Sequence, residues 1–240
     1  MELSSKITDW IKQKGTEARA KGCVLGLSGG VDSAVAALLC QKAFPKDTLA
    51  LILPCHSLKE DIQAAQAFAN KFAIQTKMID LTMVFESLFI ALTGKTYKDE
   101  MDLSIANLKP RLRMLTLYYF ANKMNYLVVG TGNKSELAMG YFTKYGDGGV
   151  DILPLGDLLK TEVNKLAAEL EVPQEIIDKA PSAGLWVGQT DEGEMGITYM
   201  VLDKILSGEL KGIPQEKIDL EKGREALSRH KRALPDIFRK

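Results

Sequence analysis

The residues best suited to chemistry lie at positions 28–33, which read SGGVDS between an apolar run and a helical pattern. A strand, a glycine-rich turn and a helix N-terminus together aim backbone N–H groups and the positive end of a helix dipole at one point. Gly29 and Gly30 allow close approach to the backbone, and Ser28 and Ser33 offer hydroxyl groups to phosphate oxygens. Asp32 supplies a carboxylate for Mg²⁺ bridging those phosphates. The stretch predicts a phosphate site.

Two common nucleotide motifs do not fit this stretch. It lacks the Gly-Lys-Ser/Thr ending of the usual phosphate loop, and Gly26, Ser28 and Gly30 do not fall on the G-x-G-x-x-G spacing of dinucleotide-binding proteins. A dehydrogenase is therefore disfavoured. The alternative without a ligand is a tight strand-to-helix turn in which Asp or Ser caps the helix.

A second polar segment, GTGNKSE, follows the apolar run 125–132. Residues beyond the carboxyl ends of parallel strands line the ligand crevice, so Thr131 and Glu136 should face the first loop. Asn133 and Glu136 also have the spacing of a capping box, and position alone leaves both interpretations open.

A third group of charged residues lies farther along the chain. Lys144 and Asp151 flank a glycine-rich stretch, as they would around a polar ligand, although Gly-Asp-Gly-Gly is also an ordinary turn. Lys160 lies near an expected helix N-terminus, where a nearby phosphate would offset its unfavourable position; a solvated side chain is the alternative. Arg111 and Arg113 interrupt an apolar helix, either to bind an anion or with their heads in water.

The elements that must position these residues are strands alternating with helices. Apolar runs at 23–28, 48–54, 73–80 and 125–132 predict buried strands, and residues 31–44 and 57–73 predict connecting helices. Such βαβ units imply parallel pairing, so we expect an α/β fold with a doubly wound, mainly parallel sheet flanked by helices.

The later elements of the chain are less regular. An expected long helix runs from Asp102 to Met124, which Pro110 should bend or restart, and its broad apolar surface favours either a buried helix or contact with a second subunit. Residues 140–154 and 179–196 are expected to be irregular, an amphipathic helix is expected at 156–172, and the C-terminus holds two more helical segments.

Composition limits the function further. Lys plus Arg and Asp plus Glu both number 31, so no net field recruits nucleic acid. The polar N-terminus is no signal peptide, and no apolar run is long enough to cross a bilayer. Three cysteines without Cys-x-x-Cys spacing suit a reducing cytoplasm, and only two histidines are present, which disfavours a zinc site or a Ser-His-Asp triad.

The stretch SGGVDS resembles the pyrophosphate loop of the ATP pyrophosphatase (PP-loop) superfamily, whose members split ATP into AMP and pyrophosphate while adenylating a substrate. Taken together, several segments resemble the NAD synthetase family in order and spacing from Ser28 to His230, with the adenine nucleotide alpha hydrolase-like fold. These segments are SGGVDSA, NLKPRLRM, GTGNKSE, FTKYGDGGVDILPL, LLKTEV, PSAGLWVGQTDE and HKR. One departure is Pro110, where the family pattern leads us to expect a small residue.

The resemblance implies a role for each matching residue. Asp32 and Lys160 would be catalytic, and Asp32 and Glu136 would hold Mg²⁺. The residues that would bind ATP are Gly26, Leu27, Ser28, Gly29, Gly30, Val31, Asp32, Ser33, Thr131, Lys160 and Ser182. The residues that would bind deamido-NAD are Arg111, Lys144, Asp151, His230 and Lys231.

The reaction implied by the resemblance is amidation of deamido-NAD by ammonia. ATP would adenylate the nicotinate carboxylate, and ammonia would then expel AMP, while segments 141–150 and 181–193 could close over the site. The family pattern uses residues 1–240 as one synthetase domain without a glutaminase domain, so free ammonia is the expected nitrogen source, and the family implies a homodimer. The alternatives are another adenylating ligase of the superfamily and an ATP-binding module without catalysis.

Overall fold

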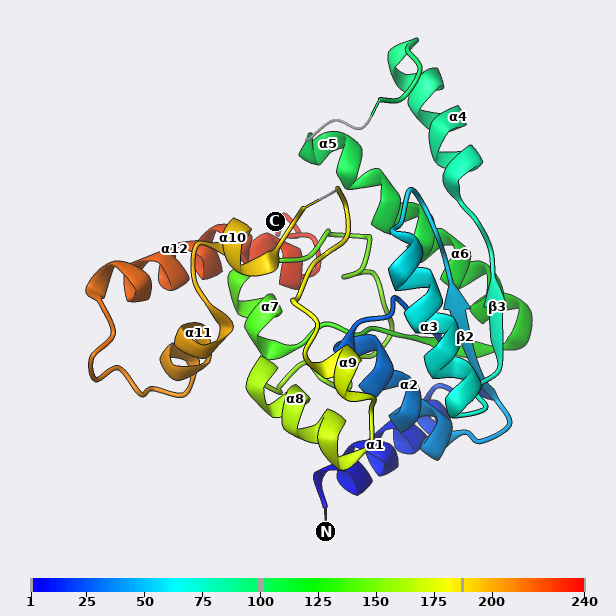
Figure 1. Ribbon diagram of the computed structural model, residues 1–240, viewed down its shortest axis with the longest axis horizontal. Helices are drawn as coiled ribbons and strands as arrows, with labels where there is room; N and C mark the ends of the chain where they lie inside the picture. Colours follow the sequence, from blue (N-terminus) through cyan, green and yellow to red (C-terminus); the bar gives the residue numbers. More distant parts are fainter. Residues whose placement is uncertain (1, 99–101, 187, 240) are drawn as a thin grey trace.

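The four expected strands form one parallel sheet in the computed structural model, which describes residues 2–98, 102–186 and 188–239 (Figure 1). The strands are β1 (Gly22–Gly26), β2 (Thr48–Ile52), β3 (Thr76–Met78) and β4 (Tyr126–Val129). Their order in the sheet is β3-β2-β1-β4, and every pairing is parallel. The chain thus winds outward from β1 in one direction and then returns to place β4 on the other side of β1. Because the strand order reverses here, the ligand crevice is expected beyond the carboxyl ends of β1 and β4.

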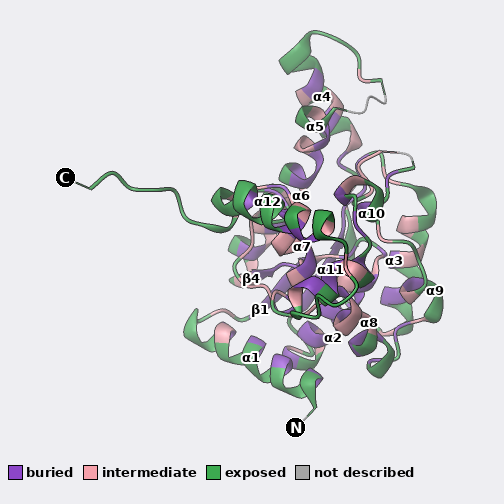
Figure 2. Cartoon of the chain, turned by 90° about the vertical axis from the view of Figure 1, so that its left-hand side faces the viewer, coloured by how far each residue is buried: buried purple, intermediate pink, exposed green. Residues whose placement is uncertain are grey.

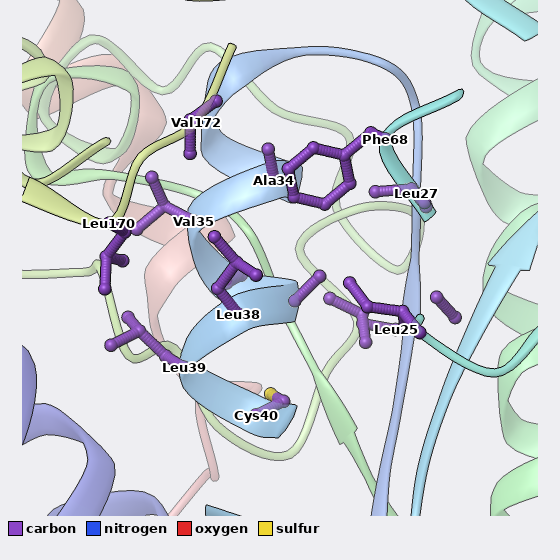
Figure 3. Close-up of a cluster of buried hydrophobic side chains, with 14 of the residues drawn as sticks. Leu25, Leu27, Ala34, Val35, Leu38, Leu39, Cys40, Phe68, Leu170 and Val172 are labelled. Carbon is purple, nitrogen blue, oxygen red and sulfur yellow. The ribbon is translucent and has the colours of Figure 1, made fainter. Parts of the chain in front are cut away.

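One face of the sheet is covered by helices near both ends of the sequence. They are α1 (Leu3–Glu17), α2 (Val31–Ala43), α3 (Lys59–Lys71), α8 (Lys160–Glu169) and α9 (Gln174–Ile177). Figure 3 shows the centre of this layer, where α2 presents Val35 and Leu39 toward Leu170 and packs near Leu25 of β1. Because ten of the thirteen residues of α2 are buried, the helix fixes the glycine-rich loop that precedes it.

The opposite face is covered mainly by α6 (Leu108–Met124), with Phe85 of α4 (Thr82–Thr93) joining the same cluster. The expected helix from Asp102 to Met124 is interrupted at Asn107, which separates α6 from the short α5 (Leu103–Ala106). Pro110 lies in the first turn of α6, where its missing N–H costs no hydrogen bond. The prediction that Pro110 marks the start of a new helix is therefore confirmed.

A third apolar cluster lies beside the sheet and belongs mostly to the C-terminal part of the chain. It joins α7 (Lys134–Met139), α10 (Asp191–Met195), α11 (Tyr199–Leu206) and α12 (Gln215–Arg232). Helix α12 lies against α7, and beyond it the last described residues extend away from the body of the molecule (Figure 2). The two expected C-terminal helices are confirmed.

Three sequence expectations need correction. The strand expected at 73–80 shrinks to β3, whose three residues are exposed because it is an edge strand with one neighbour in the sheet. The helix expected from residue 156 begins only at Lys160, after a turn. The stretch 179–196 is not wholly irregular, since α10 lies within it.

The remaining general expectations concern the cysteines and the membrane. Cys23, Cys40 and Cys55 are buried free thiols. Among the described residues, the helices are all too short or too polar to span a bilayer.

Candidate active site

The glycine-rich loop (residues 26–33) is organised by its own serines. The Ser33 hydroxyl donates to the carbonyl of Gly30 (2.8 Å) and accepts the N–H of Ser28 (3.2 Å), and the two serine hydroxyls lie 3.1 Å apart. Helix α2 then begins after Gly30 with no side-chain hydrogen bond at its N-cap. The alternative in which Asp or Ser caps this helix is therefore wrong, and the helix N-terminus is open to a ligand.

The glycines of this loop have different physical reasons for being glycine. Gly29 has φ +85°, and a Cβ there would lie 2.5 Å from the Asp61 carbonyl oxygen of α3, so the fold itself requires glycine. A Cβ on Gly26 would meet nothing within 4 Å, and one on Gly30 only the Ser28 hydroxyl at 3.5 Å. The space above these two glycines is open, as a ligand lying on the backbone would need.

Three segments of the chain converge on Asp32 at the ends of β1 and β4. Asn133, which follows β4, donates from Nδ2 to Asp32 Oδ1 at 2.8 Å. Lys160, the first residue of α8, donates from Nζ to Asp32 Oδ2. Only 4% of Lys160 is exposed, so the alternative of a solvated lysine is wrong. The carboxylate of Asp32 is what offsets its position at a helix N-terminus.

The backbone of α8 is fixed where it delivers Lys160. Lys160 N–H donates to Ser135 Oγ (3.0 Å), and Thr161 N–H donates to the carboxylate of Asp203 (2.8 Å). Asp203, on α11, also accepts the Ser135 hydroxyl (2.5 Å). Asp203 therefore ties α7, α8 and α11 together directly behind the lysine.

Burial and neighbouring charges shift the pKa values of Lys160 and Glu136 in this cluster. Burial lowers the pKa of Lys160, but the carboxylates of Asp32 and Glu136 outweigh burial and raise it, so the lysine stays protonated. Burial and the nearby Asp32 raise the pKa of Glu136 well above its ordinary value. Adding a cation beside these two carboxylates would remove their mutual repulsion.

The donor set fits Mg²⁺ in one respect and limits it in another. Carboxylates are hard oxygen ligands of the kind Mg²⁺ prefers, and Asp32 and Glu136 are close enough to perturb one another. No group of three or more His, Cys, Asp or Glu side chains in the part of the chain the structure describes is arranged to hold a metal. A magnesium ion here would depend on phosphate oxygens for further ligands, as is common for Mg²⁺.

The capping box on α7 exists together with this cluster. Glu136 N–H donates to Asn133 Oδ1 (2.9 Å), and Asn133 N–H donates to Glu136 Oε2 (3.1 Å). Asn133 thus caps α7 and holds Asp32 with a different atom of the same side chain. Position alone left two interpretations of this segment open, and the capping box is confirmed.

Two further residues surround Lys160 that sequence reasoning missed. The Lys160 ammonium lies over the Tyr199 ring, 5.3 Å from its centroid, and the Tyr199 hydroxyl donates to Asp191 Oδ2 at 3.0 Å. The other carboxylate oxygen of Asp191 is buried and has no hydrogen-bond partner among the residues that the structure describes. Tyr199 looked like a core residue of an amphipathic helix, and the only signal at Asp191 was its place in an irregular segment.

The segment of residues 181–186 is anchored on both sides. Before it, Lys179 pairs with Asp61 of α3, the residue whose carbonyl faces Gly29. After it, Gln189 donates to Glu194 Oε2 (2.8 Å) and Tyr141 Oη (3.3 Å). Ser182 is exposed on this segment, and its hydroxyl accepts the N–H of Gly184.

Three of the five residues expected to bind the dinucleotide lie together. Arg111 donates from Nε and Nη2 to the Lys144 carbonyl, both at 3.4 Å, and Lys144 Nζ donates to the His230 carbonyl at 2.6 Å. Lys231 is adjacent, but its ammonium binds the carbonyls of Gly140 (2.7 Å) and Phe142 (2.9 Å). The fold thus gathers basic side chains from α6, the segment after α7, and α12.

Asp151 and Arg113 have mainly internal partners. Asp151 accepts the Tyr118 hydroxyl (2.9 Å) and the Val128 N–H (2.8 Å), which joins it to α6 and β4. Arg113 donates to the Leu53 carbonyl (3.1 Å) and the Ser57 hydroxyl (3.3 Å). The alternative that the head of Arg113 lies in water is wrong, and Thr131 remains at the end of β4, partly exposed.

Known proteins are similar to this chain over nearly its whole length. Residues 3–235 match the model of a family described as NAD synthase. The chain belongs to the NAD synthase family. An NH₃-dependent NAD⁺ synthetase of Carboxydothermus hydrogenoformans is 49% identical over 98% of this chain and 96% of its own. One from Archaeoglobus fulgidus is 49% identical over 99% of this chain and 96% of its own.

Solved structures agree with the NAD synthase assignment. An NMN synthetase of Francisella tularensis superposes with a TM-score of 0.91 at 41% identity, covering 98% of this chain and 97% of that one. An NH₃-dependent NAD synthetase of Campylobacter jejuni superposes with a TM-score of 0.82 at 30% identity over the full length of both chains. The doubly wound sheet with flanking helices is thus the fold of NAD synthases, and the chain is an enzyme of the ligase class.

Proposed function

We propose that the crevice beyond β1 and β4 carries out the NAD synthase reaction, with roles divided among the residues described above. The chain catalyses ATP-dependent amidation of deamido-NAD by ammonia, giving NAD, AMP and pyrophosphate. The observation that carries the assignment of the site is the meeting of Asp32, Asn133 and Lys160 from three separate segments at the point where the strand order reverses.

ATP lies along the glycine-rich loop in this proposal. The N–H groups at the start of α2 hold the β- and γ-phosphates, and the open space above Gly26 and Gly30 accommodates the nucleotide. Thr131 and Ser182 contact ATP from the two flanking segments. Asp32 and Glu136 hold Mg²⁺, which would neutralise charge on the pyrophosphate as it departs.

Lys160 has a changing set of partners during the reaction. Its ammonium donates to Asp32 in the structure and donates instead to a phosphate oxygen when ATP binds. A buried cation fixed in this way stabilises negative charge that develops at phosphorus while the nicotinate carboxylate attacks. The acyl-adenylate and pyrophosphate form together, and ammonia then attacks the acyl carbon and releases AMP. The work of the protein is placement and charge stabilisation, which explains why two histidines suffice.

Deamido-NAD is held by Arg111, Lys144, Asp151, His230 and Lys231. The support is that the side chains of Arg111 and Lys144 lie together, Arg111 on the Lys144 carbonyl and Lys144 on the His230 carbonyl, which suits an anionic dinucleotide. Lys231 must exchange its bonds to Gly140 and Phe142 for the ligand, and Asp151 must accept ligand groups while bonded to Val128.

A second candidate substrate is the mononucleotide, nicotinate joined to ribose phosphate without the AMP half. The observation that favours it is the close superposition with the NMN synthetase, whose name refers to a mononucleotide product. The same adenylation chemistry would serve either substrate.

One assay distinguishes these activities. Purified protein is incubated with ATP, Mg²⁺ and ammonium plus either deamido-NAD or nicotinate mononucleotide, and all products are quantified. We expect NAD, AMP and pyrophosphate in equal amounts, with none when Mg²⁺ is chelated. A higher kcat/KM for the mononucleotide would establish the second candidate, and formation of ADP would overturn the proposal.

The three thiols support proposals about the nitrogen source and the location of the protein. A glutaminase needs an accessible nucleophilic cysteine, whereas Cys23, Cys40 and Cys55 are buried in the synthetase core. We therefore propose that residues 1–240 form one synthetase domain that contains no glutaminase centre of its own, and the NH₃-dependent relatives support free ammonia as the nitrogen source. Three unpaired thiols suit the reducing cytoplasm.

The outer surface of α6 supports a homodimer. Leu115 and Tyr119, one helical turn apart, are 60% and 59% exposed on the side of α6 away from the sheet. Their neighbour α4 exposes Met83 and Leu92 as well. A second copy of this chain, meeting the same face, would remove these side chains from water.

A further inference from the structure

Lys109 is a charged side chain in an apolar place. It is the second residue of α6, and only 1% of it is exposed. Its ammonium lies over the rings of Phe85 and Tyr97, 5.6 and 5.8 Å from their centroids. Burying a lysine is costly unless its charge is well placed, so a position of this kind indicates a specific task.

The task is visible at the tip of the side chain. Lys109 Nζ donates to the backbone carbonyl of Leu185 at 2.6 Å, across 76 residues of sequence. The N–H of the same Leu185 donates to Gln189 Oε1 at 2.7 Å. Both backbone groups of Leu185 are thus held, one by a lysine from the sheet-covering helix and one by Gln189.

The two residues of this contact lie close in sequence to residues that we assign to different substrates of the proposed reaction. Leu185 lies three residues after Ser182, which we assign to ATP, and Lys109 lies two residues before Arg111, which we assign to the dinucleotide. We propose that Lys109 is a positioning residue that clamps residues 181–186 against α6 and so keeps Ser182 at the ATP site. This inference rests on the proposed function for its link to ATP.

The clamp should act on ATP affinity more than on the chemical step. If residues 181–186 leave their place, the population competent to bind ATP falls, and the apparent affinity falls by the same factor. Loss of a charged hydrogen bond from a lysine corresponds to about a tenfold change. Replacing Lys109 by methionine keeps the apolar stem and removes only the ammonium.

The chain carries its own reporter for this segment. Of its two tryptophans, Trp186 follows Leu185 directly, and Trp10 lies on α1. In a Trp10→Phe background, acrylamide quenching measures the exposure of Trp186 alone. We expect Lys109→Met to raise the quenching constant about twofold, with or without activity. An unchanged quenching constant would show that the ammonium does not hold the segment.

Steady-state kinetics supply the second readout. For Lys109→Met we expect the KM for ATP to rise about tenfold, while the KM for deamido-NAD and kcat stay within about threefold. Equal increases in both KM values would mean that α6 itself has moved, which would overturn the positioning role. The quenching result does not depend on catalysis, so a failure of the proposed function would leave it standing.

Lys71→Met is a control for the loss of a lysine that bonds a backbone carbonyl elsewhere in the fold. The exposed Lys71 ammonium donates to the carbonyl of Glu171 (3.3 Å) and lies 5.1 Å from the centroid of the Phe72 ring. Its loss should leave both readouts unchanged. If Lys109→Met fails to fold by circular dichroism, Gln189→Ala tests the clamp from the other side, with the same increases expected and the same unchanged values counting against it.

Discussion

Gly26 and Gly29 lie in one loop but are glycines for different reasons, which we assign to ligand binding and to the fold. Gly29 needs its left-handed backbone and its contact with the Asp61 carbonyl. A Cβ on Gly26 would meet no atom of the described residues within 4 Å, so packing among those residues does not require glycine there. Gly29 is thus assigned to stability and Gly26 to binding.

The paired alanine variants test this separation. Gly26→Ala should leave the free energy of unfolding within about 0.5 kcal/mol of wild type, because its Cβ meets no atom. Its KM for ATP should rise at least about tenfold, because the methyl group occupies the space of the nucleotide. Gly29→Ala should lose about 2 kcal/mol of stability from strain. Urea denaturation and steady-state kinetics measure both, and an unchanged KM for Gly26→Ala would remove ATP from this loop.

Residues that do two things at once were hidden from the sequence. The spacing of Asn133 and Glu136 predicts a cap, and the cap is present, but nothing in the spacing shows that the same Asn133 also holds Asp32. Tyr199 fits the apolar face of its helix, so its place under the Lys160 ammonium could not be foreseen. Lys160 and Asp32 were predictable because each stands at a helix N-terminus after a turn.

At the scale of elements, the position of α8 decides where its first side chain points. Asp203 holds the helix by accepting both the Thr161 N–H and the Ser135 hydroxyl, and it is itself buried. The helix begins with a lysine although its dipole disfavours one there. The hydrogen bonds to Asp203 therefore hold α8 in place although its first residue opposes the helix dipole.

Asp203→Ala should therefore destabilise the protein strongly. Two donors would lose a charged acceptor inside the protein, and each such loss costs about 1–3 kcal/mol, so we expect a total near 3 kcal/mol. Urea denaturation monitored by circular dichroism measures the change. Asp219→Ala is the comparison, since Asp219 accepts only from exposed Gln215 on α12, and its effect should stay below about 0.5 kcal/mol. Similar losses in both variants would refute the bracing role.

The limits of sequence patterns show most clearly at element boundaries. Apolar runs revealed β1, β2 and β4 because a parallel strand covered on both faces is apolar throughout. The run at 73–80 looked the same, yet β3 is exposed whereas β4, the other edge strand, is partly buried, since an apolar run does not show how far its strand will be covered. Pro110 correctly indicated a helix start, but the break itself lies at Asn107.

At the scale of the whole molecule, the proposed dimer makes a measurable prediction. Leu115→Asp combined with Tyr119→Asp places two charges on the exposed face of α6, which would oppose burial against a second copy. Light scattering after size exclusion should give a dimer for wild type and a monomer for the double variant. Met200→Asp changes an equally exposed apolar residue of α11 and should remain dimeric. A monomeric wild type would exclude the dimer.

The burial of all three thiols has a practical consequence for the whole molecule. Hydrogen bonding with Cys23 and burial raise the pKa of Cys40, and burial raises the pKa of Cys55. Thiols of this kind react slowly, because the thiolate is the reactive form. A single cysteine introduced on the surface, for example at exposed Met200, would therefore be the fastest site for a maleimide dye or a solid support. The protein thus comes ready for one-point attachment without removal of its native cysteines.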